Sequence, residues 1–291
     1  MRSLGLLGLV IGALAVTALA SPWAAWALGP QFTFGRIYDR VFEAVFAAGV
    51  LLAWRPLDLG GPTDVGFRRR GAGRDLLVGI ASGLAGLAVG LTLAALAGGL
   101  VPALRFPAWK TLRKALLGLG AAVAIGVGEE ALFRGVVLRR LRRDAGDVLG
   151  VAATTLVYAA VHALRGGGRL ARVDAWSGLA YTLRLFAPLA DRAVLPQLFG
   201  LGLLGLLLAA ARLRSGALWL PIGLHAAFVA AFRVGRLFFD IRQRPAWMVG
   251  SGWPPLVGGV AGWIAIAIAA VLVFGGGARA PRGSGRSAVR S

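Results

Sequence analysis

Three ionisable side chains interrupt one apolar segment of this chain. The segment runs from Ala115 to Leu138, and its charged members are Glu129, Glu130 and Arg134. Each charge near the centre of a membrane helix costs roughly 2.5–3.5 kcal/mol, whereas a Leu, Ile, Val or Phe returns only about 0.3–0.6 kcal/mol. Such a segment needs polar partners from neighbouring helices, and its charged groups are therefore candidates for a functional site.

The two histidines of the chain also lie inside apolar segments. His162 ends the run 156–162, and His225 lies within the run 218–229. Glu129, His162 and His225 thus belong to three separate apolar segments, and no comparable polar set occurs elsewhere in the sequence. We expect these groups to meet in one cavity, where each solvates the others. The alternative is that each polar group is satisfied independently as a structural residue.

Helical geometry separates the two adjacent carboxylates. Glu130 and Arg134 are four residues apart with Glu nearer the N-terminus, which is the favourable orientation for an ion pair. A helix turns by about 100° per residue, so Glu129 points away from that pair. We predict that Glu130 and Arg134 form an internal ion pair that holds Glu129 in position, and that Glu129 faces water or metal.

Glu129, His162 and His225 are suited to two kinds of chemistry. A carboxylate and an imidazole can together take a proton from water, which then attacks an amide carbonyl. Two neutral imidazoles and a carboxylate can instead ligate zinc and leave a fourth position for an activated water. The helical His-Glu-x-x-His motif is absent, so a zinc site would have to be assembled from different helices. The residues alone do not choose between these mechanisms.

The elements that must position these groups are membrane-spanning helices. The chain has 291 residues, of which 58% are hydrophobic. Several apolar segments reach the roughly 18–20 residues needed to cross a bilayer, so we predict an all-α, multi-pass transmembrane bundle of about eight helices. The expected ranges are 4–28, 34–54, 76–101, 115–138, 148–164, 194–211, 216–232 and 256–275.

One integral membrane domain is expected over residues 1–278, with the motif-bearing core at about 115–232. The basic Gly/Ser/Arg tail at 279–291 has the composition of a disordered segment. Residues 165–192 are too broken by glycine and arginine to span, which predicts a loop with an interfacial helix. The N-terminus resembles a secretory signal, but its apolar character continues to Leu28, which favours a retained first helix.

The net charge of +20 does not indicate nucleic-acid binding. The arginines fall mainly between apolar segments, as expected of loops that face anionic headgroups, and the predicted partner is a lipid bilayer. The densest basic clusters, at 68–74, 139–143 and the tail, favour an orientation with both ends in the cytoplasm. The chain has no cysteine, which excludes disulfides and thiolate chemistry.

Glycines recur at four-residue spacing in the apolar segments. In lipid this spacing permits close helix packing, which we favour over a dedicated dimer interface. The pairs are Gly79 and Gly83, Gly86 and Gly90, and Gly258 and Gly262.

Three motifs in order resemble those of the CPBP family of intramembrane proteases, which includes type II CAAX prenyl endopeptidases and bacteriocin self-immunity proteins. Each motif is short and degenerate, but all three lie in apolar segments, and together they cover roughly residues 115–232. The matching residues are Glu129, Glu130 and Arg134 for Glu-Glu-x-x-x-Arg, Tyr158 and His162 for Phe-x-x-x-His with Tyr in place of Phe, and Leu218-Trp219-Leu220-Pro221 with His225 for the third motif.

The resemblance implies an intramembrane endopeptidase that cleaves a membrane-associated or lipidated substrate in the cell membrane. An arginine-rich composition points to a bacterial host. By the same resemblance, Glu129 and His162 activate the attacking water, and His225 ligates a metal or helps to stabilise the oxyanion. Glu130, Arg134 and Tyr158 are the supporting residues. Both a zinc mechanism, with His162, His225 and Glu129 as ligands, and a metal-free glutamate mechanism are compatible with the family.

One position departs from the family pattern. The third motif has Asn or a similar polar residue four positions after the histidine, whereas this chain has Val229. Loss of one oxyanion donor typically costs about 10²–10³ in rate. Another donor could replace the missing residue, and Gln197 is a candidate; the alternative interpretation of Gln197 is a packed amide. Without a replacement donor, the enzyme would be slow. The alternative function is a catalytically silent membrane scaffold or immunity-type factor.

A proton-coupled transporter is a further alternative, because it would also place Glu and His inside the membrane. Against it, the sequence shows no inverted internal repeat and no matched pair of broken helices.

Overall fold

The computed structural model describes residues 3–164, 170, 172–242, 244–252 and 254–275. Arg2, which belongs to the signal-like start, and the basic tail expected at 279–291 lie outside these residues. The long helices are α1 (Ser3–Leu28), α2 (Phe34–Leu52), α4 (Ala72–Leu96), α5 (Ala108–Glu130), α6 (Leu138–Ala163), α8 (Leu195–Ser215), α9 (Trp219–Gly235) and α11 (Val260–Gly275).

Short elements connect these helices. In the described part of the chain, strands are limited to one antiparallel pair, so the prediction of an all-α bundle is confirmed. The short elements are α3 (Pro62–Val65), β1 (Leu100–Pro102), the π-helical η1 (Ala131–Val137), α7 (Ser177–Leu185), the 3₁₀ turns η2 (Ala187–Ala190) and η3 (Arg192–Val194), β2 (Phe239–Ile241) and α10 (Ala246–Val249).

The helices have the length and apolar character of a multi-pass membrane protein. Among the described residues, four segments are long and apolar enough to cross a bilayer, and α9 and α11 are apolar but shorter. α2 is long enough but carries four charged residues in its first half. Each of the eight expected ranges contains a helix. The four long segments are Leu4–Leu28, Ala72–Leu96, Ala108–Ala163 and Arg192–Ser215.

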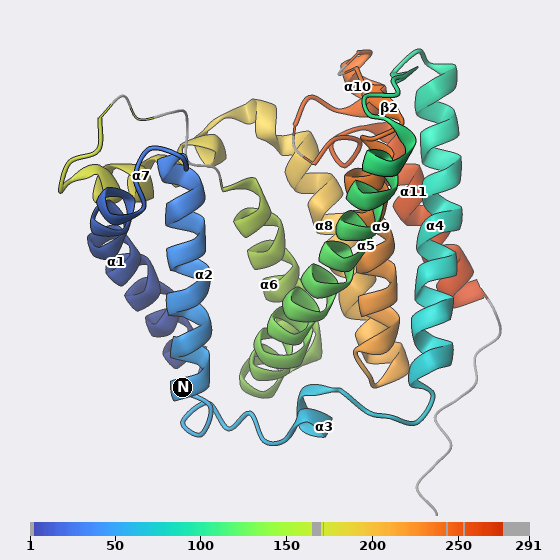
Figure 1. Ribbon diagram of the computed structural model, residues 1–291. Coiled ribbons are helices and arrows are strands. Elements are labelled where there is room, and N and C mark those ends of the chain that lie inside the picture. Colours follow the sequence, from blue (N-terminus) through green and yellow to red (C-terminus); the bar gives the residue numbers. More distant parts are fainter. Residues whose placement is uncertain (1–2, 165–169, 171, 243, 253, 276–291) are drawn as a thin grey trace, which may run out of the picture.

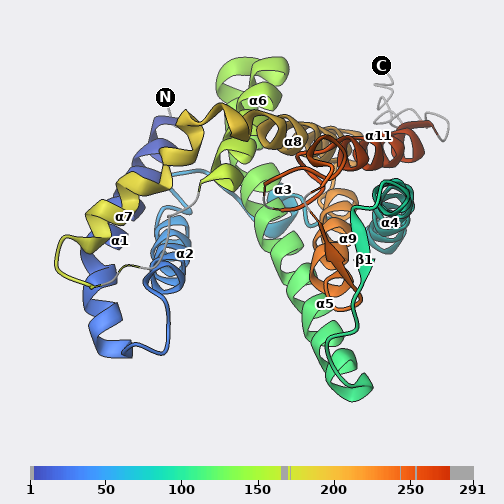
Figure 2. The same ribbon diagram turned by 90° about the horizontal axis from the view of Figure 1, so that it is seen from above.

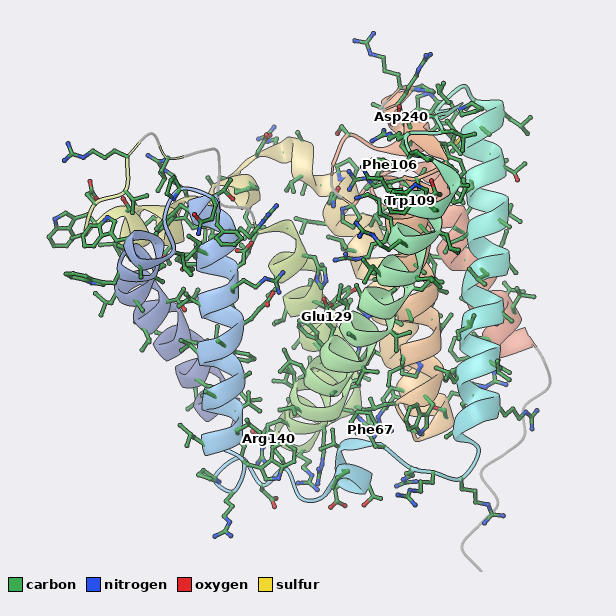
Figure 3. The ribbon with its side chains drawn as sticks, in the orientation of Figure 1. Phe67, Phe106, Trp109, Glu129, Arg140 and Asp240 are labelled. Atoms are coloured by element: carbon green, nitrogen blue, oxygen red, sulfur yellow. The ribbon has the colours of Figure 1, made fainter. Side chains whose placement is uncertain are left out.

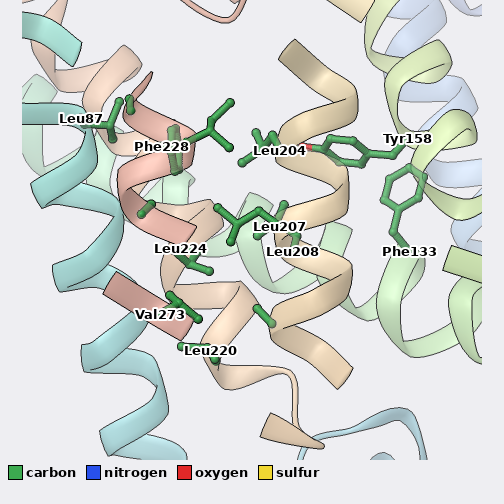
Figure 4. Packing of buried hydrophobic residues seen from close by; sticks show 14 residues of the cluster. Leu87, Phe133, Tyr158, Leu204, Leu207, Leu208, Leu220, Leu224, Phe228 and Val273 are labelled. Atoms are coloured by element: carbon green, nitrogen blue, oxygen red, sulfur yellow. The ribbon is translucent and has the colours of Figure 1, made fainter. Parts of the chain in front are cut away.

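The helices form two groups, with α5 and α6 between them (Figures 1 and 2). α1, α2 and α7 lie together on one side of the molecule, α4, α9 and α11 lie on the other, and α5 and α6 lie between them. The largest apolar core lies in the second group and joins α4, α8, α9 and α11 to the start of η1 and the end of α6. Figure 4 shows this core, with Phe133 and Tyr158 at its edge.

The helix continues past its expected end at residue 138, and the break expected between 138 and 148 lies at Gly146. The arginines of 139–143 lie on the helix, because Arg is a good helix former and charges of both signs pair along this stretch. Arg140 pairs with Asp144 at 3.4 Å, and Arg142 Nε donates to Asp147 at 2.8 Å. The reversal occurs at Gly146, whose φ of 82° suits glycine. The rest of α6 then runs back past η1, where Tyr158 and His162 pack near Phe133, and brings position 162 next to position 129.

α4 ends at Leu96, earlier than the expected 101. Gly98 has a φ of 75°, a conformation in which glycine commonly ends a helix. The apolar residues that follow form β1 instead, and Leu100 pairs with Ile241 of β2. The helix expected in 165–192 is present as α7, and its interfacial position stays a prediction.

α4 packs with its backbone directly against two other helices. A Cβ on Gly79 would lie 2.3 Å from the carbonyl oxygen of Leu220 in α9, and a Cβ on Gly86 would lie 2.2 Å from that of Ala265 in α11. The expected close packing is therefore confirmed for the α4 glycines. The pair Gly258 and Gly262 does not form such a stripe, because Gly258 precedes α11.

Candidate active site

The charged residues of the first motif lie where α5 changes into a π-helical turn. Glu129 and Glu130 are the last residues of α5, and η1 begins at the next residue and contains Arg134. Such π-turns inside helices are frequent at functional sites. Two contacts accompany this turn: Arg134 Nη2 donates to the carbonyl of Gly205 in α8 at 3.1 Å, and Gly135 packs tightly against Val65 of α3.

Glu130 joins Arg134 to His225 in a fully buried group. Arg134 Nη1 lies 2.9 Å from Glu130 Oε1, and the same oxygen lies 2.8 Å from His225 Nδ1. Exposure is 0% for Glu130, 1% for Arg134 and 3% for His225. Because a carboxylate paired with arginine only accepts, His225 Nδ1 carries a hydrogen and donates it. The predicted ion pair is present, and through Glu130 it holds His225, whereas Glu129 is held by the histidines.

Glu129 lies against His162 on the more accessible side. His162 Nε2 is 3.1 Å from Glu129 Oε2, and His162 Nδ1 is 2.8 Å from the carbonyl oxygen of Tyr158, to which it donates. The side chains of His162 and Glu129 are 22% and 32% exposed. His225 Nε2 approaches the same oxygen of Glu129 to 3.7 Å. The structure therefore brings Glu129, His162 and His225 together, near the middle of the helices (Figure 3).

The ring of Tyr158 separates the accessible groups from the buried ion pair. It packs on His162 with ring centroids 4.1 Å apart, and the guanidinium carbon of Arg134 lies 4.5 Å from its centroid. Tyr158 is only 1% exposed. Its aromatic faces thus fix the positions of both neighbours.

A cavity of about 300 Å³, here called the central cavity, opens beside these groups. Glu129, Tyr158, His162 and His225 line it, and so does Val229, one turn after His225. Gln197 lines a different cavity, of about 220 Å³, next to Ala163. Gln197 is therefore not brought to the central cavity as a replacement donor. The remaining lining residues are Ile125, Leu201, Leu204, Phe228, Phe232, Arg233, Arg236, Pro254 and Val257.

Sequence reasoning missed Arg233 and Arg236 as residues of this cavity. They follow His225 by eight and eleven positions, a spacing that keeps all three near one face of a helix. The spacing can be read from the sequence, but only the structure shows that this face of α9 borders a cavity.

The site residues have part of the donor chemistry of a zinc site. Both histidines use Nδ1 to donate to an oxygen and turn Nε2 toward Glu129, which is donor chemistry found around zinc. However, no group of three or more His, Cys, Asp or Glu side chains among the described residues has an arrangement that could hold a metal ion. Glu129 and His162 instead make direct contact at hydrogen-bond distance. This arrangement does not fit zinc, and no step proposed below passes through a metal.

Comparison with known proteins gave one family. The family model for type II CAAX prenyl endopeptidase Rce1-like proteins matches residues 111–231. This stretch runs from the first turns of α5 into the last turns of α9 and contains the residues that surround Glu129. No curated protein and no solved structure matched the chain.

Proposed function

The chain belongs to the Rce1-like family of type II CAAX prenyl endopeptidases, and on this premise we propose that it cleaves a peptide bond with water activated by Glu129 and His162. The observation that carries the proposal is the 3.1 Å contact between Glu129 Oε2 and His162 Nε2 at the wall of the central cavity. A carboxylate and an imidazole at this distance can share one proton and exchange it with a water beside them.

Hydrogen-bond chemistry limits the protonation states of this pair. An ionised carboxylate cannot donate, so the contact holds one proton, either on His162 Nε2 or on Glu129. Before attack the pair must be without that proton, with Glu129 ionised and His162 neutral at Nε2. In that state the two groups accept from a water in the central cavity and leave its oxygen free to attack.

The reaction then balances with these groups alone. The water oxygen bonds to the carbonyl carbon of the peptide, its proton passes to Glu129 and His162, and the carbonyl oxygen becomes an oxyanion. His225 Nε2 faces this region, and when protonated it can donate to the oxyanion. The C–N bond breaks as the shared proton passes to the leaving nitrogen, and the second proton of the water stays on its oxygen, which gives a carboxylic acid and an amine.

The buried ion pair supports the charge that His225 requires. To donate through Nε2 while Nδ1 donates to Glu130, His225 must carry both ring protons and a positive charge. Glu130 supplies the compensating negative charge at 2.8 Å, and Arg134 pairs with that glutamate at 2.9 Å. Glu130 and Arg134 are thus positioning residues in the proposed mechanism.

The proposed substrate is a membrane-associated or lipidated peptide. The central cavity lies among apolar helices, and a lipid-anchored peptide would reach it from the bilayer or its edge. The proposal includes a location in the cell membrane of a bacterium, which the arginine-rich composition supports.

Val229 favours a second candidate, a catalytically silent scaffold or immunity-type factor of the same family. Valine lines the central cavity at the position where the family pattern has a polar residue. To test this candidate, the gene is deleted and then complemented with the wild-type gene or with a Glu129→Ala, His162→Ala double variant. A catalytically silent protein predicts that both rescue the deletion phenotype equally well.

The experiment for the proposed protease is a cleavage assay in proteoliposomes. Membrane-tethered peptides, with and without a prenyl group, are incubated with the purified protein, and the masses of the products are measured by mass spectrometry. We expect two fragments whose masses sum to the peptide plus one water, formed equally well with and without a strong chelator. Loss of cleavage on chelation, restored by zinc, would contradict the metal-free mechanism; absence of any cleavage would favour the silent protein.

A further inference from the structure

Four arginines from three different elements meet at one end of the helices and are here called the arginine cluster. They are Arg68 of the segment between α3 and α4, Arg139 and Arg142 of α6, and Arg212 of α8. The charges of the other three all lie near enough to act on that of Arg212. The cluster is at the lower end of the molecule in Figure 3, where the neighbouring Phe67 and Arg140 are labelled, and Glu129 lies above it. It is therefore separate from the candidate active site.

Two glycine turns, at the ends of α3 and α8, place Arg68 and Arg212 close together. The turns are joined by a hydrogen bond from Leu218 N to the carbonyl oxygen of Gly66, at 2.9 Å. A Cβ on Gly66 would lie 3.0 Å from Arg212 Nη2, and a Cβ on Gly216 would lie 3.7 Å from Arg68 Nη1. Each guanidinium thus lies beside the turn of the other element, so packed backbone positions both charges.

The carboxylates of the protein compensate only one member of the cluster. Arg142 donates to both carboxylate oxygens of Asp147, at 2.8 and 2.9 Å. Among the described residues, no carboxylate pairs with the other three arginines. The cluster therefore has an excess of positive charge, and its members repel one another. Two further acidic side chains pair with neighbours of the cluster in α6, Asp144 with Arg140 and Asp58 with Arg143.

Two of the uncompensated arginines are partly withdrawn from water. Arg212 is half-buried, and its Nε is buried without a hydrogen-bond partner in the described part of the chain. Arg139 is also half-buried, and its Nη1 donates to the neutral carbonyl of Leu59 at 2.7 Å. Removing a cation from water costs free energy that an anion at hydrogen-bond distance offsets. An anion bound between these arginines would therefore stabilise the folded protein.

Aromatic side chains place the cluster at the level of a membrane interface. The rings of Phe67 and Trp219 pack edge to face with centroids 5.7 Å apart, and Trp219 Nε1 donates to the backbone oxygen of Arg68 at 2.6 Å. Tryptophan is enriched at membrane–water interfaces, where its ring is apolar and its N–H is polar. Both rings belong to an apolar cluster that also contains Val65 and Leu218 beside the two turns. The arginines thus adjoin a small apolar core at the end of the helices, where lipid headgroups lie.

We propose that the arginine cluster binds the phosphate of an anionic phospholipid, with Arg68, Arg139 and Arg212 as the donors. A guanidinium presents parallel N–H groups that match two oxygens of a phosphate. Basic pockets between membrane helices bind phospholipid headgroups with this chemistry. A lipid is favoured over free phosphate because Phe67 and Trp219 hold the cluster at the interface.

The bound phosphate would join two elements that also meet in the membrane. Arg134 of η1 donates to the carbonyl of Gly205 in α8 at 3.1 Å. Arg139 lies five residues after Arg134, and Arg212 lies seven residues after Gly205. A phosphate held by both arginines therefore ties the start of α6 to the end of α8 a second time. Lipid binding should accordingly raise the stability of the whole fold.

The test uses the full chain in mixed micelles of a neutral detergent with either phosphatidylcholine or phosphatidylglycerol, at equal ionic strength. A third arm adds inorganic phosphate to the phosphatidylcholine micelles. The measurements are the midpoint of thermal unfolding and the retention of lipid by the protein in native mass spectrometry. The variants are Arg68→Gln, Arg212→Gln and both together. The control is Arg70→Gln with Arg74→Gln, which removes the same charge from exposed residues at the same end.

We expect phosphatidylglycerol to raise the midpoint of the wild type over that in phosphatidylcholine. The shift should be on the order of 5 °C, as for a ligand present at about a hundred times its Kd. The Arg68→Gln, Arg212→Gln double variant should lose most of this shift and retain less phosphatidylglycerol, whereas the control keeps both. In phosphatidylcholine, Arg212→Gln should be at least as stable as the wild type, because it removes a crowded charge.

Three results would overturn the inference. An equal shift in the double variant and the control would show a diffuse effect of charge, an equal shift with inorganic phosphate would show that the ligand is not a lipid, and no shift in the wild type would exclude binding. If the double variant does not fold, Arg68→Gln at its exposed position decides the question, since it should lose part of the shift and a full shift would contradict the site. Cleavage is not measured, so the outcome is independent of the proposed protease.

Discussion

His225 is held by Glu130 of another helix: its Nδ1 lies 2.8 Å from Glu130 Oε1, while its Nε2 lies 3.7 Å from Glu129 Oε2. The two adjacent glutamates therefore contact opposite nitrogens of one imidazole. Since Glu130 is also paired with Arg134, one buried carboxylate ties the end of α5 and the π-turn η1 to α9. Loss of Glu129 and loss of Glu130 should therefore have different consequences.

Glu130→Gln should destabilise the protein as well as lower its activity. The substitution keeps the shape of the side chain but leaves the Arg134 charge uncompensated in a site with no exposed surface. Breaking a buried pair in this way costs about 3–5 kcal/mol. We expect a matching loss in the free energy of unfolding, measured by denaturant titration in detergent, and a fall in kcat of about 10²-fold as protonated His225 loses its compensating negative charge.

The control for this variant is Glu130→Gln combined with Arg134→Met. Removing both charges should restore part of the lost stability, because no unpaired ion is left in the core. Activity should stay low, since His225 still lacks its carboxylate partner. Full stability in the single variant would mean that the pair does not carry the charges described above.

Gly79→Ala should disrupt the contact between α4 and α9. The new Cβ would lie 2.3 Å from the backbone oxygen of Leu220 and 2.8 Å from the nitrogen of Leu224, and neither atom can move without shifting α9. Overpacking of this kind typically costs about 1–3 kcal/mol, and here it also displaces the helix that carries His225. Gly73→Ala in the same helix meets nothing within 4 Å and is the matched control. Equal unfolding midpoints for the two variants would contradict the packing described here.

Val229→Asn should raise kcat. Valine lines the central cavity one turn beyond His225, where an amide could donate to the oxyanion. Since a single oxyanion donor is worth about 10²–10³ in rate, an increase of roughly tenfold or more is expected even with imperfect geometry. Val229→Leu, of similar shape to the Asn variant but without a donor, should show no gain. The same kcat for both variants would mean that position 229 does not face the developing charge.

The sequence predicted those parts of the fold that depend on local pattern. Apolar length located the helices, and the four-residue spacing of Glu130 and Arg134 predicted their ion pair, because both depend only on geometry within one helix. The end of α4 was placed too late, because Gly98 and the pairing of β1 with β2 override an apolar run. The helical path through Arg139–Arg143 was missed, because charge was taken as a sign of a loop.

The partner of Glu130 was not predictable from spacing. His225 is 95 residues away in sequence, and their contact depends on how α9 packs against α5. For the same reason the ion pair was expected to hold Glu129, whereas the structure has it holding His225. The sequence pattern identified which residues belong to the polar set. The orientation of each imidazole depends on helix packing and is seen only in the tertiary structure.

The most direct test of the account is the rate at which Glu129→Gln protein cleaves a membrane-tethered peptide that the wild type cleaves. Glu129 is partly exposed and Gln has the same shape, so the variant should keep the unfolding midpoint of the wild type. If Glu129 accepts the proton of the attacking water, cleavage should fall by roughly 10²–10⁴-fold. A folded Glu129→Gln protein that cleaves at the wild-type rate would contradict this role.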